Sequence, residues 1–331
     1  MKDSPAAGTA ERYRDFSREA AAAHSPGYAA LSTAIAEDPT VLAFLDALPP
    51  RKRQPNLFFG ALRYLHGHLD DAAQLRRWVV EDADLLRATM LARATQTNEP
   101  ARCTALLPLL AALPQPIGLI EVGASAGLCL YPDRYGYDYD GVPVGPPSPV
   151  HLSCATSGPV PVPAQLPTVA ARVGVDLNPL DPADPDTRAW LEALIWPEHT
   201  ERRERLGAAL DLAAAEPAQM LRGDLLYLLP EAVAALPAGC TPVVVHTAVL
   251  TYLPPPARDD FVALVGELGV RWISQEGPQV LPGIAARLTA EVGPADFVLA
   301  LDGEPVAVTA PHGGRVDWLG RAVSEAAAPA R

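Results

Sequence analysis

The sequence lacks the features that mark several common classes of protein. Its four cysteines are widely spread, with no C-x-x-C pair and no histidine at zinc-finger spacing, so we expect neither a disulfide framework nor a metal site. No stretch approaches the roughly 20 apolar residues that span a bilayer. The first residues also lack the apolar segment of a secretory signal. We therefore expect a cytoplasmic protein that is not inserted in a membrane.

Basic residues are also in short supply. The chain has 26 lysine and arginine residues against 39 aspartate and glutamate residues, a formal net charge of -13. A negative field repels the phosphate groups of nucleic acids and of anionic membranes, and the basic run at residues 51–53 is short enough to be a solvated turn. We expect no nucleic-acid or membrane partner, and a small molecule as substrate.

The first third of the chain has a helical pattern. Apolar residues recur at three- and four-residue spacing between proline and glycine breaks. Ser25-Pro26 and Asp38-Pro39 mark helix starts, because proline suits the first turn and its predecessor disfavours helix. Residues 1–115 are therefore predicted to form an all-helical domain or lid. The expected helices are 10–23, 27–37, 39–48, 56–67, 70–81, 84–96 and 102–113.

After residue 116 the pattern changes to short apolar runs that suit buried parallel strands. Helical patterns lie between most of these runs, which predicts an α/β fold with a mostly parallel, doubly wound sheet. Asp302-Gly303, between the last two runs, predicts a closing antiparallel hairpin. The expected strands are 118–122, 171–176, 219–223, 242–246, 271–275, 297–301 and 305–309.

A turn of small residues follows the first expected strand. Glu121 closes the strand, and Gly123, Ser125 and Gly127 follow, so backbone amides can approach a ligand and the next helix presents its N-terminus. The turn resembles the glycine-rich first motif of S-adenosylmethionine-dependent methyltransferases, with Ser125 in place of the middle glycine. A plain tight turn is the alternative. The resemblance implies a Rossmann-like, methyltransferase-type domain over residues 116–331, with a seven-stranded sheet that ends in the antiparallel hairpin.

Two later strand ends extend the resemblance. Asp176 and Asn178 follow the second expected strand, where such enzymes hold the ribose hydroxyls of the cofactor. Asp224 and Leu225 follow the third strand and resemble the segment beside the adenine. The resemblance therefore implies that these residues and the glycine-rich turn bind S-adenosylmethionine. Helix capping is the alternative for each acid.

The spacing between the turn and Asp176 departs from that of a compact unit. It far exceeds the roughly 20 residues of a simple βαβ unit, which predicts an insertion at about residues 131–168. The insertion is rich in tyrosines, which could line a substrate pocket or lid. Arg134 and Tyr137 are its catalytic candidates. A packed β-hairpin is the alternative.

His246 ends the fourth expected strand, where open α/β sheets place ligands and catalytic groups. Histidine titrates near neutrality and suits proton transfer, so His246 is the expected general base. Glu276, which closes the fifth strand, and Tyr252, just beyond His246, could converge on the same mouth. A buried histidine that holds a loop, and structural roles for the other two, are the alternatives.

Two further polar segments could reach the site. Residues 196–199 with Arg202 and Arg203 could clamp a carboxylate, although a loop anchored by a core tryptophan is the alternative. Asn98 and Glu99, at the end of an expected helix, could enter the cleft. Capping of that helix is the alternative.

Eight short segments match one known family over nearly the whole chain. They are residues 53–57, 97–99, 121–128, 133–137, 173–180, 196–199, 222–224 and 246–248. Through them the chain resembles a little-characterised bacterial family, common in actinobacteria, whose fold is related to that of methyltransferases. This family usually has asparagine after Gly-Leu, where this chain has Cys129. The change lies beside the ligand turn and bears on the cofactor or the substrate.

Three functions agree with these patterns. The first is S-adenosylmethionine-dependent methylation of a small molecule in secondary metabolism. The second keeps the fold without the cofactor, for example intramolecular displacement or cyclisation of a natural-product intermediate, and is motivated by Ser125 and Cys129. The third is a non-catalytic protein whose helical N-terminal region binds a protein partner, because fold resemblance does not fix function.

Overall fold

A computed structural model describes residues 8–69, 71–288, 290–293 and 295–320. The chain divides into two compact units. The helical unit comprises residues 1–97 and 184–204, and the sheet unit comprises residues 98–183 and 205–331. Residues 98–115, expected in the helical region, therefore group with the sheet. Conversely, residues 184–204, an excursion from the second half of the chain, belong to the helical unit.

Proline and aspartate fix where helices of the helical unit begin. Pro26, Pro39 and Pro55 each stand at the start of a helix, where the fixed φ suits the helix and the missing N–H is not needed. Asp38 caps α3, since its carboxylate accepts two first-turn amides at 2.8 and 3.2 Å. The expected helical N-terminal region is confirmed. Its elements are α1 (Thr9–Ala22), α2 (Pro26–Glu37), α3 (Pro39–Asp46), η1 (Pro50–Lys52), α4 (Pro55–His66), α5 (Ala72–Glu81) and α6 (Ala83–Ala92), joined by α8 (Pro185–Ala193) and the start of α9 (Thr200–Ala215).

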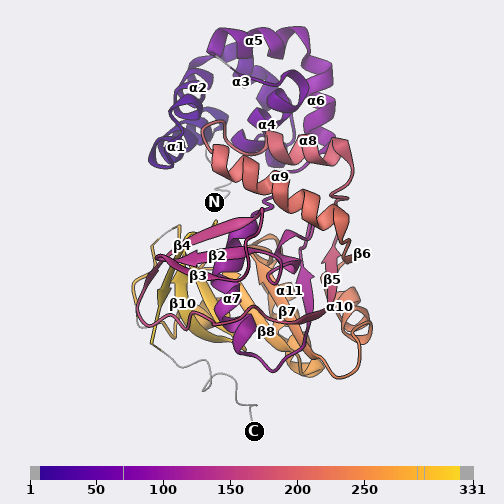
Figure 1. The fold of residues 1–331 in the computed structure, drawn as a ribbon. Coiled ribbons are helices and arrows are strands. Elements are labelled where there is room, and N and C mark those ends of the chain that lie inside the picture. The colour runs from indigo at the N-terminus through magenta and orange to yellow at the C-terminus, as the bar shows by residue number, and fades with distance from the viewer. Residues whose placement is uncertain (1–7, 70, 289, 294, 321–331) are drawn as a thin grey trace. The chain divides into compact units, whose positions relative to one another are not determined.

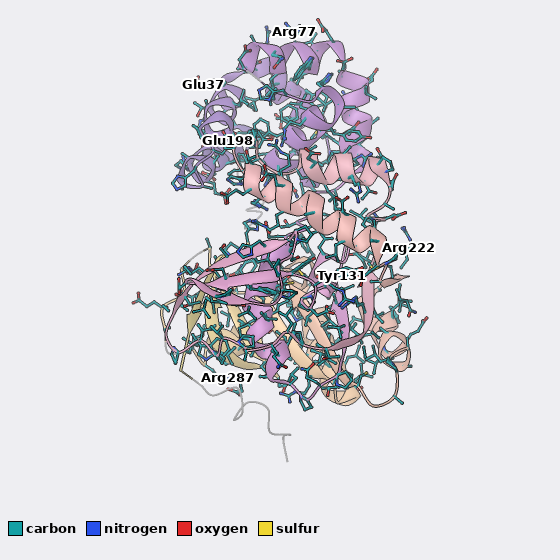
Figure 2. All side chains as sticks on the ribbon, in the orientation of Figure 1. Glu37, Arg77, Tyr131, Glu198, Arg222 and Arg287 are labelled. Carbon is teal, nitrogen blue, oxygen red and sulfur yellow. The ribbon has the colours of Figure 1, made fainter. Side chains whose placement is uncertain are left out.

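The excursion is anchored to the other helices of its unit by named side chains. Trp196 Nε1 donates to Asn56 Oδ1 at 2.9 Å, and its ring meets that of Phe16 edge-on at 5.4 Å between centroids. Glu198, labelled in Figure 2, accepts a hydrogen bond from Ser25 Oγ at 2.7 Å. These contacts favour the anchored-loop alternative for this segment over a clamp on a ligand.

Eleven strands of the sheet unit form one mixed sheet, in the order β3-β2-β4-β11-β10-β9-β8-β7-β1-β5-β6 (Figure 1). Parallel pairing runs from β6 through β5, β1 and β7 to β8. β9 is antiparallel to both β8 and β10, which confirms the antiparallel C-terminal pair. The strands are β1 (Ile117–Val122), β2 (Gly136–Tyr139), β3 (Val142–Val144), β4 (His151–Ser157), β5 (Val169–Asp176), β6 (Gln219–Arg222), β7 (Thr241–Thr247), β8 (Arg271–Glu276), β9 (Phe297–Leu301), β10 (Glu304–Thr309) and β11 (Arg315–Trp318).

The order of the parallel strands is that of a doubly wound sheet. The chain moves outward from β1 to β5 and β6, then returns to the other side of β1 with β7 and β8. The direction therefore reverses between β1 and β7. Open α/β sheets bind ligands outside the carboxyl ends of their strands at such a reversal.

The sheet is larger than the seven strands expected, because four strands were missed. β2, β3 and β4 come from the insertion predicted at about residues 131–168, and β11 follows the hairpin. β2 and β3 form an antiparallel hairpin, as the packed-hairpin alternative required. The helix expected after the glycine-rich turn is a further correction. Only the 3-10 turn η3 (Leu128–Leu130) lies between β1 and β2.

One face of the sheet is apolar and covered by helices. Ile120 and Val122 of β1, with Val244 of β7, pack there against Phe261 and neighbouring side chains of α10, α11 and α12. Alternation along the strands sends the residues between them to the opposite face. No helix in the described part of the chain is long and apolar enough to cross a membrane. The helical elements of this unit are η2 (Pro100–Arg102), α7 (Cys103–Ala112), α10 (Leu225–Ala234), η4 (Leu250–Tyr252), α11 (Pro255–Leu268) and α12 (Pro282–Ala285), with the end of α9.

Candidate functional site

The candidate site lies where the loops after β1 and β7 leave the sheet. Two residues that are not glycine, Ser125 and Ala248, have positive φ angles of 52° and 58° in these loops. This conformation is uncommon for residues with a Cβ, and such strained residues cluster at functional sites. Backbone strain and the strand reversal therefore point to the same place.

The glycine-rich turn is closed by hydrogen bonds within the sheet unit. With all five amides occupied, the turn in this conformation offers no free N–H to an anionic ligand. The Val175 carbonyl accepts from Gly123 and Ala124 at 2.7 and 3.3 Å, Asp176 Oδ2 from Ser125 at 2.8 Å, Asn98 Oδ1 from Ala126 at 3.0 Å, and the Ala124 carbonyl from Gly127 at 2.7 Å.

Gly123 is required by the packing of the two loops. Its φ is 70°, and a Cβ at this position would lie 2.4 Å from a methyl carbon of Val249, in the loop after β7. Only glycine meets both conditions. A glycine that the sequence pattern associates with a ligand therefore has a structural reason to be present.

Asp176 ties the turn to the loop that follows β5. One carboxylate oxygen accepts the Ser125 N–H at 2.8 Å and the other accepts the Asn178 N–H at 2.7 Å. Each oxygen has a second lone pair, and the side chain is only half-buried, so Asp176 can still accept ligand hydroxyls. Asn178 Oδ1 accepts from Arg222, which Figure 2 labels, at 2.9 Å. Asn98 reaches the same turn and donates to Ser125 Oγ at 3.0 Å.

Asp224 has the geometry of a helix cap. Its Oδ1 accepts the Leu226 N–H at 2.8 Å, which satisfies one of the free amides at the start of α10. Leu225 is the first residue of that helix and packs, partly buried, against the apolar face. The capping alternative therefore describes Asp224.

Three large side chains are exposed beyond the carboxyl ends of neighbouring strands. Leu177 follows β5, Tyr227 lies in the first turn after β6, and Tyr252 lies in η4 after β7; they are 73%, 82% and 81% exposed. Apolar surface beside polar groups is typical of a ligand-binding region. Tyr252 therefore follows the carboxyl end of β7, and its side chain is exposed.

His246 and Glu276 form a pair that is buried in the apolar face. Trp272 Nε1 donates to His246 Nε2 at 2.9 Å, and an indole can only donate. The ring proton therefore lies on Nδ1, which donates to Glu276 Oε1 at 2.8 Å. The same oxygen accepts the amides of Val249 and Leu250 at 2.8 and 2.9 Å. Both ring nitrogens are occupied, so this geometry favours the loop-holding alternative over a general base.

A second set of polar side chains is buried beside the turn. Burial raises the pKa of Glu121 well above its ordinary value, the Cys129 thiol adds to the rise, and the Arg102 guanidinium opposes it. Glu121 Oε2 is buried and has no hydrogen-bond partner among the described residues. Close by, the Cys129 thiol donates to the carbonyl of Glu99, whose carboxylate pairs with Arg205 at 3.0 Å. Burial therefore favours the neutral form of Glu121.

The tyrosine-rich insertion is packed rather than open. Tyr137 and three neighbouring tyrosines are at most 1% exposed, and each hydroxyl donates to a main-chain carbonyl at 2.6 to 2.8 Å. Burial raises the pKa of Tyr137 well above its ordinary value. Arg134 instead lies on the surface and pairs with Glu216 at 2.9 Å. The contacts of both residues are structural in this conformation.

Residues 10–318 match the family described as "Uncharacterized protein conserved in bacteria (DUF2332)". The chain belongs to the DUF2332 family. The bacterial family expected from the eight segments is thereby confirmed, and the match extends over both units of the DUF2332 chain. No curated protein and no solved structure matches it. None of these comparisons links DUF2332 to methyltransferases.

Sequence reasoning missed three polar residues of the site. Arg102, Thr247 and Gln275 come from η2, β7 and β8, and meet only through the fold. A polar residue inside an apolar strand was the available signal for Gln275. In the part of the chain that the structure describes, no three His, Cys, Asp or Glu side chains gather as a metal site would require.

Proposed function

We propose that this DUF2332 protein transfers a methyl group from S-adenosylmethionine to a small molecule at the carboxyl ends of β1, β5 and β7. Asp176 carries the proposal. Its carboxylate lies beside the strand reversal, is fixed by two main-chain amides, and keeps a lone pair on each oxygen. Two adjacent acceptors suit the paired hydroxyls of a ribose.

The surroundings of Asp176 fit the nucleoside half of this cofactor. Leu177 and Tyr227 expose apolar surface at the ends of the two neighbouring strands, which suits a planar purine ring. The glycine-rich turn fits the charged end only after a rearrangement, because its amides are occupied. A ligand carboxylate there must displace the side chain of Asn98 from the amide of Ala126.

S-adenosylmethionine supplies an electrophilic methyl group when it is bound. The chain contributes by holding the two reactants in line and by excluding water. Asp176 orients the ribose end. His246 acts indirectly. Glu276 accepts hydrogen bonds both from His246 and from two amides of the loop after β7, so the pair holds that loop in place.

Calorimetric titration of the nucleotide-stripped protein with S-adenosylmethionine and S-adenosylhomocysteine tests the proposal. We expect binding that Asp176→Ala weakens by about 10- to 100-fold, the range for hydrogen bonds to a charged group. Asp138→Ala is the matched control, because Asp138 is a half-buried carboxylate of the β2–β3 hairpin that accepts one turn amide at 2.7 Å. No binding by the folded wild-type protein rejects the proposal. Equal affinity in the two variants removes Asp176 from the cofactor site.

The closed turn favours a second candidate, an enzyme that needs no S-adenosylmethionine. A turn whose five amides are all satisfied is already complete without a ligand. Intramolecular displacement or cyclisation of a small molecule is then the reaction class. Mass spectrometry distinguishes the two candidate functions. Extract from cells that lack the protein is incubated with the stripped protein, and the products are analysed. A product heavier by one methylene, formed only with added cofactor, indicates methyl transfer, whereas an isomer formed without it indicates cyclisation.

A further inference from the structure

A stripe of polar side chains crosses the sheet face opposite the apolar one. Glu121 pairs in register with Val245, two residues before Thr247, and Thr247 pairs with Gln275. Residues in register, or two apart, point to the same face. Glu121, Thr247 and Gln275 therefore share one face, and Gln275 Nε2 donates across it to Thr309 Oγ1 at 2.8 Å. The stripe begins at the strand ends that form the candidate site.

Arg102 is a buried cation on this face that has no hydrogen bond to a described carboxylate. It is 5% exposed, and its hydrogen bonds go to neutral oxygens. Nε donates to the Pro311 carbonyl at 3.0 Å, and Nη1 donates to the Thr247 carbonyl and hydroxyl at 3.0 and 3.1 Å. The hydrogen bonds of Arg102 to described residues are made by Nε and Nη1, and none of them goes to a carboxylate. Buried arginines are almost always paired with an anion.

Two buried oxygens on the same face also lack partners in the described part of the chain. Glu121 Oε2 and Gln275 Oε1 belong to side chains that are 5% and 0% exposed, and neither atom accepts or donates a hydrogen bond. A buried polar atom without a partner costs about 1 to 3 kcal/mol. Two unpartnered oxygens and a buried cation share this face, which indicates that something polar and anionic completes it.

We propose that the face formed by Arg102, Glu121 and Gln275 binds a small carboxylic acid that also carries a hydroxyl or amino group. The guanidinium pairs with the carboxylate of the ligand. The unpartnered Oε2 of Glu121, when protonated, donates a second hydrogen bond to that carboxylate, and Gln275 Oε1 accepts from the hydroxyl or amine. The idea that this acid is the substrate for methyl transfer rests on the proposed function. Binding of the carboxylate does not depend on that function and needs no cofactor.

Calorimetry and thermal unfolding with three small probes test the site in the full chain without S-adenosylmethionine. The probes are glycolate, with a carboxylate and a hydroxyl; acetate, with the carboxylate alone; and glycolamide, neutral and similar in shape. Ionic strength is matched with sodium chloride. We expect glycolate to bind best and to raise the melting temperature most, acetate to bind more weakly, and glycolamide to have no effect. No binding of either carboxylate by the folded protein overturns the proposal.

Two variants assign the binding to these residues. Arg102→Gln should weaken both carboxylates by about 10- to 100-fold, whereas Arg258→Gln should not, although Arg258 likewise donates to main-chain carbonyls, at 2.9 Å. Gln275→Met should remove the preference for glycolate over acetate and leave acetate binding unchanged. This ratio keeps the test valid if Arg102→Gln fails to fold, because a purely structural role would not alter it. An unchanged ratio, or equal loss in both arginine variants, overturns the assignment.

The titrations with S-adenosylmethionine and with carboxylates fail independently. Cofactor binding without carboxylate binding leaves methyl transfer in place and rejects this acceptor class. Carboxylate binding without cofactor binding supports the site and redirects the function to cofactor-independent chemistry.

Discussion

Replacing Gly123 with alanine tests whether contact between the loops after β1 and β7 holds the candidate site together. The new Cβ would lie 2.4 and 2.6 Å from two methyl carbons of Val249, at a φ of 70°. The left-handed backbone costs a residue with a Cβ about 1 to 2 kcal/mol, and overpacking costs about 1 to 3 kcal/mol. We therefore expect Gly123→Ala to lower the free energy of unfolding by about 2 to 5 kcal/mol.

Two further variants separate the backbone cost from the clash. Gly269→Ala places alanine at a φ of 63°, where no atom lies within 4 Å of the new Cβ, so only the backbone cost of about 1 to 2 kcal/mol remains. Val249→Ala removes both methyl groups that Gly123→Ala would strike. In the double variant the clash is relieved, so the two changes should be less destabilising together than their sum by about 1 to 3 kcal/mol.

Urea unfolding followed by circular dichroism measures the wild type and the four variants, and S-adenosylhomocysteine titration shows whether the double variant keeps its ligand site. A Gly123→Ala protein as stable as Gly269→Ala would mean that Val249 does not press on the turn. A cycle with no coupling between Gly123→Ala and Val249→Ala would refute the loop contact in the same way. Loss of ligand binding in a well-folded double variant would instead assign Gly123 to the ligand.

Two other substitutions test the buried acids. Burial raises the pKa of Glu121 above its ordinary value of 4.5, so between that value and the raised one the folded chain binds more protons than the unfolded chain, and stability falls as pH rises. The Glu121→Gln side chain cannot ionise, so the stability of this variant relative to wild type should increase from pH 4 to pH 8. The increase should be about 1.4 kcal/mol for each unit by which the pKa of Glu121 is raised. Urea titrations at each pH measure it, and a constant difference would contradict the assignment. Glu276→Ala should destabilise by about 3 kcal/mol or more, because it leaves three buried donors, on His246 and two loop amides, without their acceptor at about 1 to 3 kcal/mol each. Glu276→Gln should lose less, and equal losses would show that the shared acceptor is unimportant.

The helices and most of the longer strands could be predicted because their patterns are local, although the seven-residue β4 was missed. Asp38-Pro39 marks the start of α3 through capping and a fixed φ. β1 and β7 are nearly continuous apolar runs, since both of their faces are buried. β2 and β3 were missed because they are three or four residues long and include Pro143 and Gly136. The pairing of β2 with both β3 and β4 stabilises what the local sequence does not.

The sequence predicts candidate residues at strand ends and turns but not their contacts. Ser125 and Asp176, predicted as turn and strand-end residues, share a hydrogen bond, and Asp176 acts electrostatically on Glu121. The partners that occupy the turn amides come from elsewhere, since Asn98 reaches Ala126 across a large sequence separation. His246 was chosen by its place at a strand end. Its burial between Trp272 and Glu276 depends on strand pairing and on α11, which no local pattern contains.

The sequence by itself determined the helical N-terminal region, the doubly wound sheet with its antiparallel end, and the positions of the strand-end acids, because capping, periodicity and turn chemistry act over a few residues. Only the tertiary structure decided which of these groups are already satisfied. It closed the glycine-rich turn with Asn98 and Asp176 and joined His246 to Glu276. It also left Arg102 buried with no hydrogen bond to a described carboxylate. Hydrogen bonding and burial depend on residues far apart in the chain, and these determine where a ligand can still bind.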